Sequence, residues 1–164
     1  LKEHWDAASC WSGAFMENIM ADNRNHFTAY LKAEDPLYPC NAVAAKYKGT
    51  CYLMQTSYIL TLNNQNFMET FNWCKKADEG FEDICYQSLG RDASGSSVSD
   101  AKKAKDICLL GEDFKQQSNC VIGAVKDFIS YFHGDQEAKH FCSLFEENLQ
   151  GVCNGTAQEY VKVL

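Results

Sequence analysis

The sequence predicts an all-α protein, an α-solenoid of antiparallel helix hairpins with a repeat of about 34 residues and one disulfide per hairpin. Three observations predict it. Two series of cysteines recur with one period, the hydrophobic residues around them follow helical spacing, and only two prolines occur in 164 residues. A hydrophobic fraction of 46% is sufficient for a packed core and excludes a disordered chain.

The cysteines define the period. Successive members of the first series are 34, 34 and 34 residues apart, and those of the second are 34, 35 and 33 apart. The first series is Cys40, Cys74, Cys108 and Cys142, and the second is Cys51, Cys85, Cys120 and Cys153. Two interleaved series with the same period indicate a repeated supersecondary unit of two helices.

The residues around the cysteines predict two helices per repeat. Asn63-Asn64, Ser99-Asp100 and Asp135 each precede apolar residues at helical spacing, which predicts a first helix that ends near the first cysteine. A short polar turn follows, and the second helix carries the second cysteine in its first or second turn. The residues one, four, five and eight positions beyond that cysteine share one face, which is mostly apolar or small.

A cysteine at the end of one helix faces a cysteine at the start of its antiparallel neighbour, at the separation of about 5.5 Å between Cα atoms that a disulfide needs. We therefore expect one disulfide within each hairpin, each contributing roughly 3 kcal/mol in the chain-entropy account. The expected pairs are Cys40–Cys51, Cys74–Cys85, Cys108–Cys120 and Cys142–Cys153.

The period also divides the chain. Residues 1–164 are predicted to form a single repeat domain, with a partial repeat and an inserted loop in 1–39, full repeats in 40–73, 74–107 and 108–141, and a terminal hairpin in 142–164. About seven residues are inserted between Cys10 and Cys51, and two prolines lie there. We expect a long loop with a short helix near 27–32. It either carries binding contacts or is a spacer packed by Leu37 and Tyr38, and the spacer is the default interpretation.

Cys10 is the ninth cysteine and has no partner at the repeat spacing. The residues after it, from Trp11 to Ile19, match the second helix of the other repeats. Its partner is therefore expected about eleven residues earlier, before Leu1, so that the chain is a fragment of a longer one. The alternative is a free or intermolecular thiol.

The 34-residue helix–turn–helix unit resembles tetratricopeptide-type repeats, and its disulfides resemble those of secreted bacterial cysteine-rich relatives of that class. The characteristic order of Trp, Leu-Gly, Tyr, Ala, Phe and Pro is absent from every repeat. The resemblance therefore implies the architecture and a general role in protein recognition, and it assigns no functional residue.

Composition and motifs argue against several classes of function. A formal net charge of −7 without a basic block argues against nucleic-acid binding. No apolar run approaches the roughly 20 residues of a membrane-spanning helix. Phosphate-binding loops, catalytic serine and zinc motifs and Cys-x-x-Cys pairs are absent, and the four histidines are expected at the surface or as caps: His4, His26, His133 and His140. We thus expect no cofactor, no metal and no catalytic residue.

Polar residues recur six and seven positions beyond the second-series cysteines, and they are the candidate binding residues. On stacked second helices these residues would form a partly acidic column. The column either lines a groove for a peptide or ligand, or consists of helix-pairing contacts and salt bridges between repeats. The second alternative is the default interpretation. The candidates are Glu17, Tyr58, Arg91, Asp92, Lys126 and Asp127. A sequon at Asn154 permits glycosylation in a eukaryotic secretory pathway.

These observations rank the possible functions. First is a non-enzymatic scaffold in an extracytoplasmic compartment (secreted, periplasmic or cell-surface), because paired cysteines persist under oxidising conditions. Its partner would be a protein or peptide, including copies of itself or a larger assembly. The alternative is a small-ligand or metal-binding protein that uses the acidic column, and an enzyme comes third.

Overall fold

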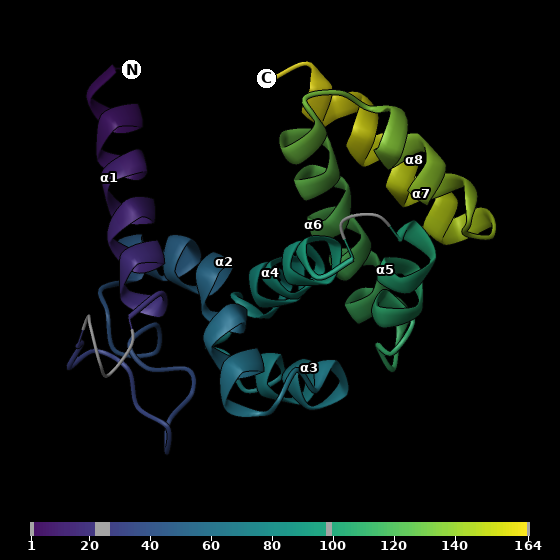
Figure 1. Cartoon of the computed structure of the whole chain (residues 1–164). Coiled ribbons are helices and arrows are strands. Elements are labelled where there is room, and N and C mark those ends of the chain that lie inside the picture. Colours follow the sequence, from purple (N-terminus) through teal and green to yellow (C-terminus); the bar gives the residue numbers. More distant parts are fainter. Residues whose placement is uncertain (1, 22–26, 98–99, 164) are drawn as a thin grey trace. The chain divides into compact units, whose positions relative to one another are not determined.

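The computed structural model describes residues 2–21, 27–97 and 100–163. Within these ranges the chain forms eight α-helices and no strand, which confirms the all-α class (Figure 1). The expectations for His26 and Ser99 fall outside the described residues. The helices are α1 (Lys2–Ile19), α2 (Ala45–Leu62), α3 (Phe67–Cys74), α4 (Glu82–Gly95), α5 (Ala101–Cys108), α6 (Phe114–Phe132), α7 (Gln136–Ser143) and α8 (Glu147–Val161).

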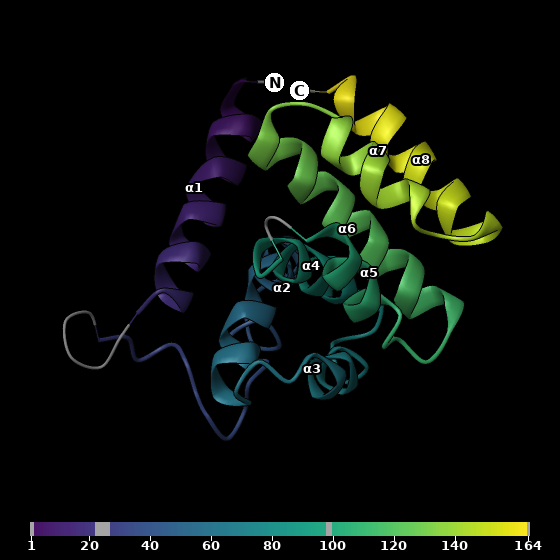
Figure 2. The same ribbon diagram turned by 45° about the vertical axis from the view of Figure 1, so that its right-hand side comes forward.

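The chain divides into two compact units, Leu1–Cys85 and Tyr86–Leu164, and α4 begins in the first and continues in the second. In the first unit α2 packs against α1 and α3. In the second unit α6 packs against α5, α7 and α8, and the last three helices lie side by side in both ribbon views (Figure 1 and Figure 2). The single repeat domain and its solenoid arrangement stay predictions.

All four predicted disulfides are formed, with Cα atoms 5.3 Å apart in Cys40–Cys51 and 5.4 Å apart in the other three. The eight cysteines are completely buried, whereas Cys10 is exposed and unpaired. In each pair the first cysteine lies at or just before the end of a short helix or turn, and the second lies in the first or second turn of a longer helix. The predicted placement of the cysteines is therefore confirmed.

The predicted apolar face of the second helices forms the core. Every residue one, four, five and eight positions beyond Cys51, Cys85 and Cys120 is buried. The buried residues are Tyr52, Gln55, Thr56 and Ile59 on α2, Tyr86, Leu89, Gly90 and Ala93 on α4, and Val121, Ala124, Val125 and Phe128 on α6. Phe128 continues this core to α7 through its ring contact with Phe141, at 5.2 Å between centroids.

Helix α4 crosses α6 in backbone contact. A Cβ atom on Gly90 would lie 1.9 Å from the carbonyl oxygen of Cys120, and one on Gly123 would lie 1.9 Å from the carbonyl oxygen of Gln87. Only glycine permits this approach at both positions, because any larger residue would push the two helices apart.

Of the predicted caps, Asp100 is confirmed, and Asp135 lies at the N-cap position of α7 but its side chain makes no cap hydrogen bond. The side chains of Asp100 and Asp113 accept hydrogen bonds from the third amide of α5 and α6. The prediction that Asn63-Asn64 caps α3 was wrong, because Asn66 is the cap and accepts from the Glu69 amide. Asn63 instead accepts from the Asn66 amide, which positions the cap itself.

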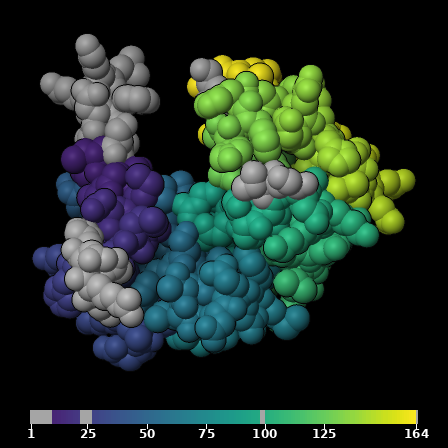
Figure 3. Space-filling model, viewed as in Figure 1, coloured from purple at the N-terminus to yellow at the C-terminus, as the bar shows by residue number. Residues whose placement is uncertain are grey.

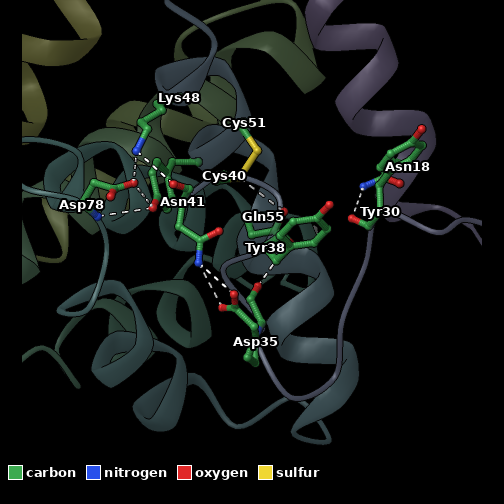
Figure 4. The surroundings of a disulfide bond; sticks show 12 residues. Asn18, Tyr30, Asp35, Tyr38, Cys40, Asn41, Lys48, Cys51, Gln55 and Asp78 are labelled. Carbon is green, nitrogen blue, oxygen red and sulfur yellow. Dashed lines mark hydrogen bonds and ion pairs between the residues drawn. A yellow bond between two sulfur atoms is a disulfide. The ribbon is translucent and has the colours of Figure 1, made fainter. Parts of the chain in front are cut away.

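The segment 27–44 contains turns and no helix, so the predicted short helix near 27–32 was wrong. The Tyr30 amide donates to the Thr28 hydroxyl, a local bond that competes with helical hydrogen bonding. Farther along, Leu37 is buried at 4% exposure, and the Gln55 amide donates to the carbonyls of Pro36 and Tyr38 (Figure 4). This part of the loop packs on α2, as the spacer interpretation expects.

Candidate functional site

Four of the predicted binding residues lie where α4 meets α6 in the second unit. The Arg91 guanidinium lies 2.7 Å from the Asp92 carboxylate. The Lys126 ammonium donates to the side-chain oxygen of Gln87 at 3.1 Å, and the Gln87 amide donates to Asn119 at 2.9 Å. The Arg91–Asp92 contact lies within α4, whereas the hydrogen bonds of Gln87 with Lys126 and Asn119 run from α4 to α6.

The electrostatics of this cluster reflect its burial. Desolvation raises the pKa of Asp127 above its ordinary value, although the Ser94 hydroxyl and the Arg91 charge oppose the shift. Desolvation also lowers the pKa of Lys126. Both shifts disfavour the charged forms, which is expected for groups between packed helices. The geometry agrees with helix-pairing contacts, and a binding role for the four residues stays a prediction.

The other two predicted residues belong to the first unit. Glu17 is exposed on α1, and Tyr58 is half-buried on α2. Burial raises the pKa of Tyr58, and the nearby Glu34 carboxylate adds to the shift. Glu17 and Tyr58 thus belong to a different compact unit from Arg91, Asp92, Lys126 and Asp127.

A partly buried polar cluster that sequence reasoning missed connects α2 to the turn before α4. The Lys48 ammonium and the Tyr52 hydroxyl both contact one carboxylate oxygen of Asp78, at 2.6 Å and 2.7 Å (Figure 4). The hydrogen bond from Lys48 holds the pKa of Asp78 below its ordinary value, and burial raises the pKa of Tyr52. Asp78 is 30 residues from Lys48 and 26 from Tyr52 in the chain, so no local sequence pattern predicts that these side chains meet. The cluster holds the turn before α4 against α2.

Metal ligation has no support in the described residues: no three histidine, cysteine, aspartate or glutamate side chains among them are grouped as ligands. None of the helices in the described part of the chain has the length and apolar character needed to cross a bilayer.

An open groove of about 820 Å³ lies in the second unit, between the tips of its two disulfide-linked hairpins. We call it the tip groove. Its apolar residues are Leu109, Phe114, Phe145 and Leu149, and its polar residues are Lys105, Gln117, Glu146, Glu147, Asn148 and Gln150.

The two disulfides Cys108–Cys120 and Cys142–Cys153 position the tip groove, because each fixes the turn that supplies one wall. Leu109 and Phe114 remain 40% and 53% exposed, although both are large and apolar. Phe145 also lines the groove but is buried, with the Lys105 ammonium 6.0 Å from its ring centroid. Glu146 and Glu147 add two exposed carboxylates at the start of α8.

Sequence reasoning missed the tip groove because it treated the turn as polar. A signal was present, since Leu109-Leu110 directly follows Cys108 and Phe114 comes directly after the Asp113 cap. Large apolar residues in a short turn are either packed or exposed, and periodicity does not distinguish the two cases.

We compared the chain with protein-family models, with curated proteins and with solved structures, and none of the three comparisons found a match. The functional argument therefore depends on the geometry of the chain itself.

Proposed function

We propose that the protein is a non-enzymatic interaction scaffold in an oxidising, extracytoplasmic compartment, built from stacked, tetratricopeptide-like helix hairpins. In this proposal the tip groove holds a peptide segment of a protein partner. Four buried disulfides are typical of proteins from oxidising compartments. The observation that carries the proposal is the tip groove, an exposed apolar surface with a polar rim between two covalently fixed turns.

The chemistry of the tip groove defines the partner segment. Leu109, Phe114 and Leu149 offer apolar surface, and Glu146 and Glu147 place two negative charges beside it against the single positive charge of Lys105. An extended segment that alternates apolar and basic side chains would satisfy both features. The net charge of −7 attracts such a segment from a distance.

The expected affinity is modest. Complete burial of one Leu or Phe side chain contributes about 1.5–3 kcal/mol, and ordering a flexible peptide opposes this gain. With two or three such side chains buried, the dissociation constant should lie between roughly 1 mM and 1 μM. This range is typical of transient recognition of a peptide segment.

The test uses three fluorescein-labelled nine-residue peptides, which alternate leucine with lysine, with glutamate or with serine. Fluorescence anisotropy should show that the lysine peptide binds most tightly and that the glutamate peptide binds least. Phe114→Ser should weaken lysine-peptide binding about tenfold or more, which corresponds to the loss of one buried aromatic side chain. Tyr131→Ser is the matched control, because Tyr131 is also exposed on α6 but does not line the tip groove.

Two results would contradict the proposal. Equal binding to the wild type and to Phe114→Ser would show that the peptide docks elsewhere. Equal binding of the lysine and glutamate peptides would show that Glu146 and Glu147 do not select the partner. The alternative of a small ligand in the acidic column has no geometric observation in its favour, since Arg91 and Asp92 form an ion pair with each other and Lys126 donates to Gln87 of α4.

A further inference from the structure

The Lys48–Asp78 contact of the first unit has an open counterpart in the second. Lys48 lies three residues before the second cysteine of its hairpin, and Asp78 lies four residues after the first cysteine of the next hairpin. At the same positions of the following two hairpins the chain has Gln117 and Glu146. Both of these residues line the tip groove. The two pairs therefore have the same place relative to their disulfides, but only the first pair is an ion pair.

The contact in the first unit shows how a carboxylate at this position binds an ammonium group. The Lys48 ammonium lies 2.6 Å from the Asp78 carboxylate and donates to the Asn41 carbonyl at 3.2 Å (Figure 4). The Tyr52 hydroxyl donates to the same carboxylate oxygen of Asp78 at 2.7 Å. The ammonium group is thus bound by one carboxylate and one main-chain carbonyl, in a side chain that is only 17% exposed.

Glu146 lacks both partners that its counterpart has. The lysine is replaced by Gln117, whose side-chain amide donates instead to the Gly111 carbonyl at 2.7 Å. The tyrosine is replaced by Val121, which has no hydroxyl group. Glu146 is exposed, its side chain makes no cap hydrogen bond to α8, and no ion pair joins it to another described residue. The tip groove is therefore open at the position that a lysine fills in the first unit.

The rest of the tip groove suits a lysine side chain. The groove lies between the α5–α6 hairpin and the α7–α8 hairpin, whose surfaces run from teal to yellow-green in Figure 3. Leu109 has the position of Asn41, directly after the first cysteine of its hairpin. Lys105, the cationic residue of the lining, has its ammonium group near the ring of Phe145. An incoming lysine thus meets a carboxylate, together with apolar surface for its alkyl chain.

We propose that the tip groove contains a subsite for one lysine side chain of the partner segment, in which Glu146 binds the ammonium group as Asp78 binds Lys48. The Leu109 carbonyl is the second acceptor, in the place of the Asn41 carbonyl. This inference rests on the proposed function, because it assigns one residue of the bound peptide. It adds a positional requirement: the segment needs a lysine beside Glu146, whereas long-range attraction would accept a basic residue anywhere.

The experiment combines two peptides with two carboxylate variants. The leucine–lysine and leucine–serine peptides are titrated into the intact wild type, Glu146→Gln and Glu147→Gln, and binding is followed by fluorescence anisotropy. Glu146→Gln should reduce the preference for the lysine peptide over the serine peptide about fivefold, the effect of an ion pair that is partly removed from water. Glu147→Gln removes the same charge from the neighbouring residue and should reduce the preference less than about twofold, through long-range attraction alone.

A further variant fills the subsite from within the protein. Gln117→Lys restores the lysine of the first-unit contact, which should pair with Glu146 and lower the affinity for the lysine peptide about fivefold. The affinity for the uncharged serine peptide should change less than about twofold. Gln158→Lys is the matched control, because it adds the same charge at an exposed position of α8 outside the tip groove. It should lower the affinity for the lysine peptide less than about twofold.

Two results would overturn the lysine subsite in variants that melt like the wild type. One is an equal effect of Glu146→Gln and Glu147→Gln, and the other is an equal effect of Gln117→Lys and Gln158→Lys. If Phe114→Ser still weakens peptide binding in that case, the tip groove remains the peptide site and only the subsite is wrong. Unaltered binding in Phe114→Ser would instead contradict the proposed function, and the subsite with it.

Discussion

The crossing of α4 and α6 leads to a quantitative prediction for Gly90→Ala. The added methyl group would lie 1.9 Å from the Cys120 carbonyl oxygen and 2.9 Å from the Ala124 amide nitrogen. Both atoms belong to the helical backbone, which does not move aside as a side chain would. The helices must therefore separate by about 1 Å or more, because carbon–oxygen contacts need more than about 3 Å.

The expected cost follows from overpacking. Inserting a methyl group into a packed core costs about 1–3 kcal/mol, and a rigid backbone neighbour favours the upper value. Replacing a helical glycine with alanine also stabilises the helix by about 1 kcal/mol, because alanine has the higher helix propensity. The net loss of unfolding free energy is then about 2 kcal/mol, which lowers Tm by roughly 4–8 °C in a chain of this length.

The assay is thermal unfolding by circular dichroism, with the disulfides intact. Gly151→Ala is the control, because a Cβ atom on this helical glycine meets nothing within 4 Å. It should raise the stability by about 0.5–1 kcal/mol. If Gly90→Ala melts at or above the temperature of the wild type, the backbone contact between α4 and α6 is refuted. Gly123→Ala tests the same contact from the other helix and should lower Tm similarly.

Three further predictions concern the remaining contacts. Asp127→Asn should gain stability relative to the wild type as pH rises from about 3 to about 7 in melting curves, because burial raises the pKa of the folded carboxyl group and disfavours its charged form. Gln55→Ala should cost about 1–3 kcal/mol and speed amide exchange in 35–43, since the buried Pro36 carbonyl and the partly buried Tyr38 carbonyl lose their donor. The double variant Cys108→Ala/Cys120→Ala should lose about 3 kcal/mol in chemical denaturation, without change in the other disulfides.

The helices and disulfides could be predicted because their signals are local. Each cysteine pair is 11 or 12 residues apart, and the buried face of each second helix repeats within three turns. The loop after α1 gave no such signal. Its course depends on Asn18 and Gln55, which lie in helices on either side of it and bond to its backbone.

The candidate sites were harder to predict for a related reason. Periodicity identified Arg91, Asp92, Lys126 and Asp127 correctly as recurrent, but recurrence is shared by residues that bind partners and by residues that pair helices. The tip groove depends on whether Leu109 and Phe114 are covered, which only tertiary packing decides. Glu17 was predicted for its place in the column, which stays a prediction, and the structure places it in the lining of a pocket of about 390 Å³ between α1 and the loop before α2.

The pairing of neighbouring cysteines has a consequence for how the covalent connectivity arises and changes. Eight cysteines allow about 105 pairings, yet here every bond joins a cysteine of this set to the next one along the chain. No bond encloses another, so each can form as soon as its own hairpin meets oxidising conditions. A hairpin can likewise be duplicated or deleted in the gene without leaving any other cysteine unpaired. Such a chain can vary in length while its connectivity stays correct.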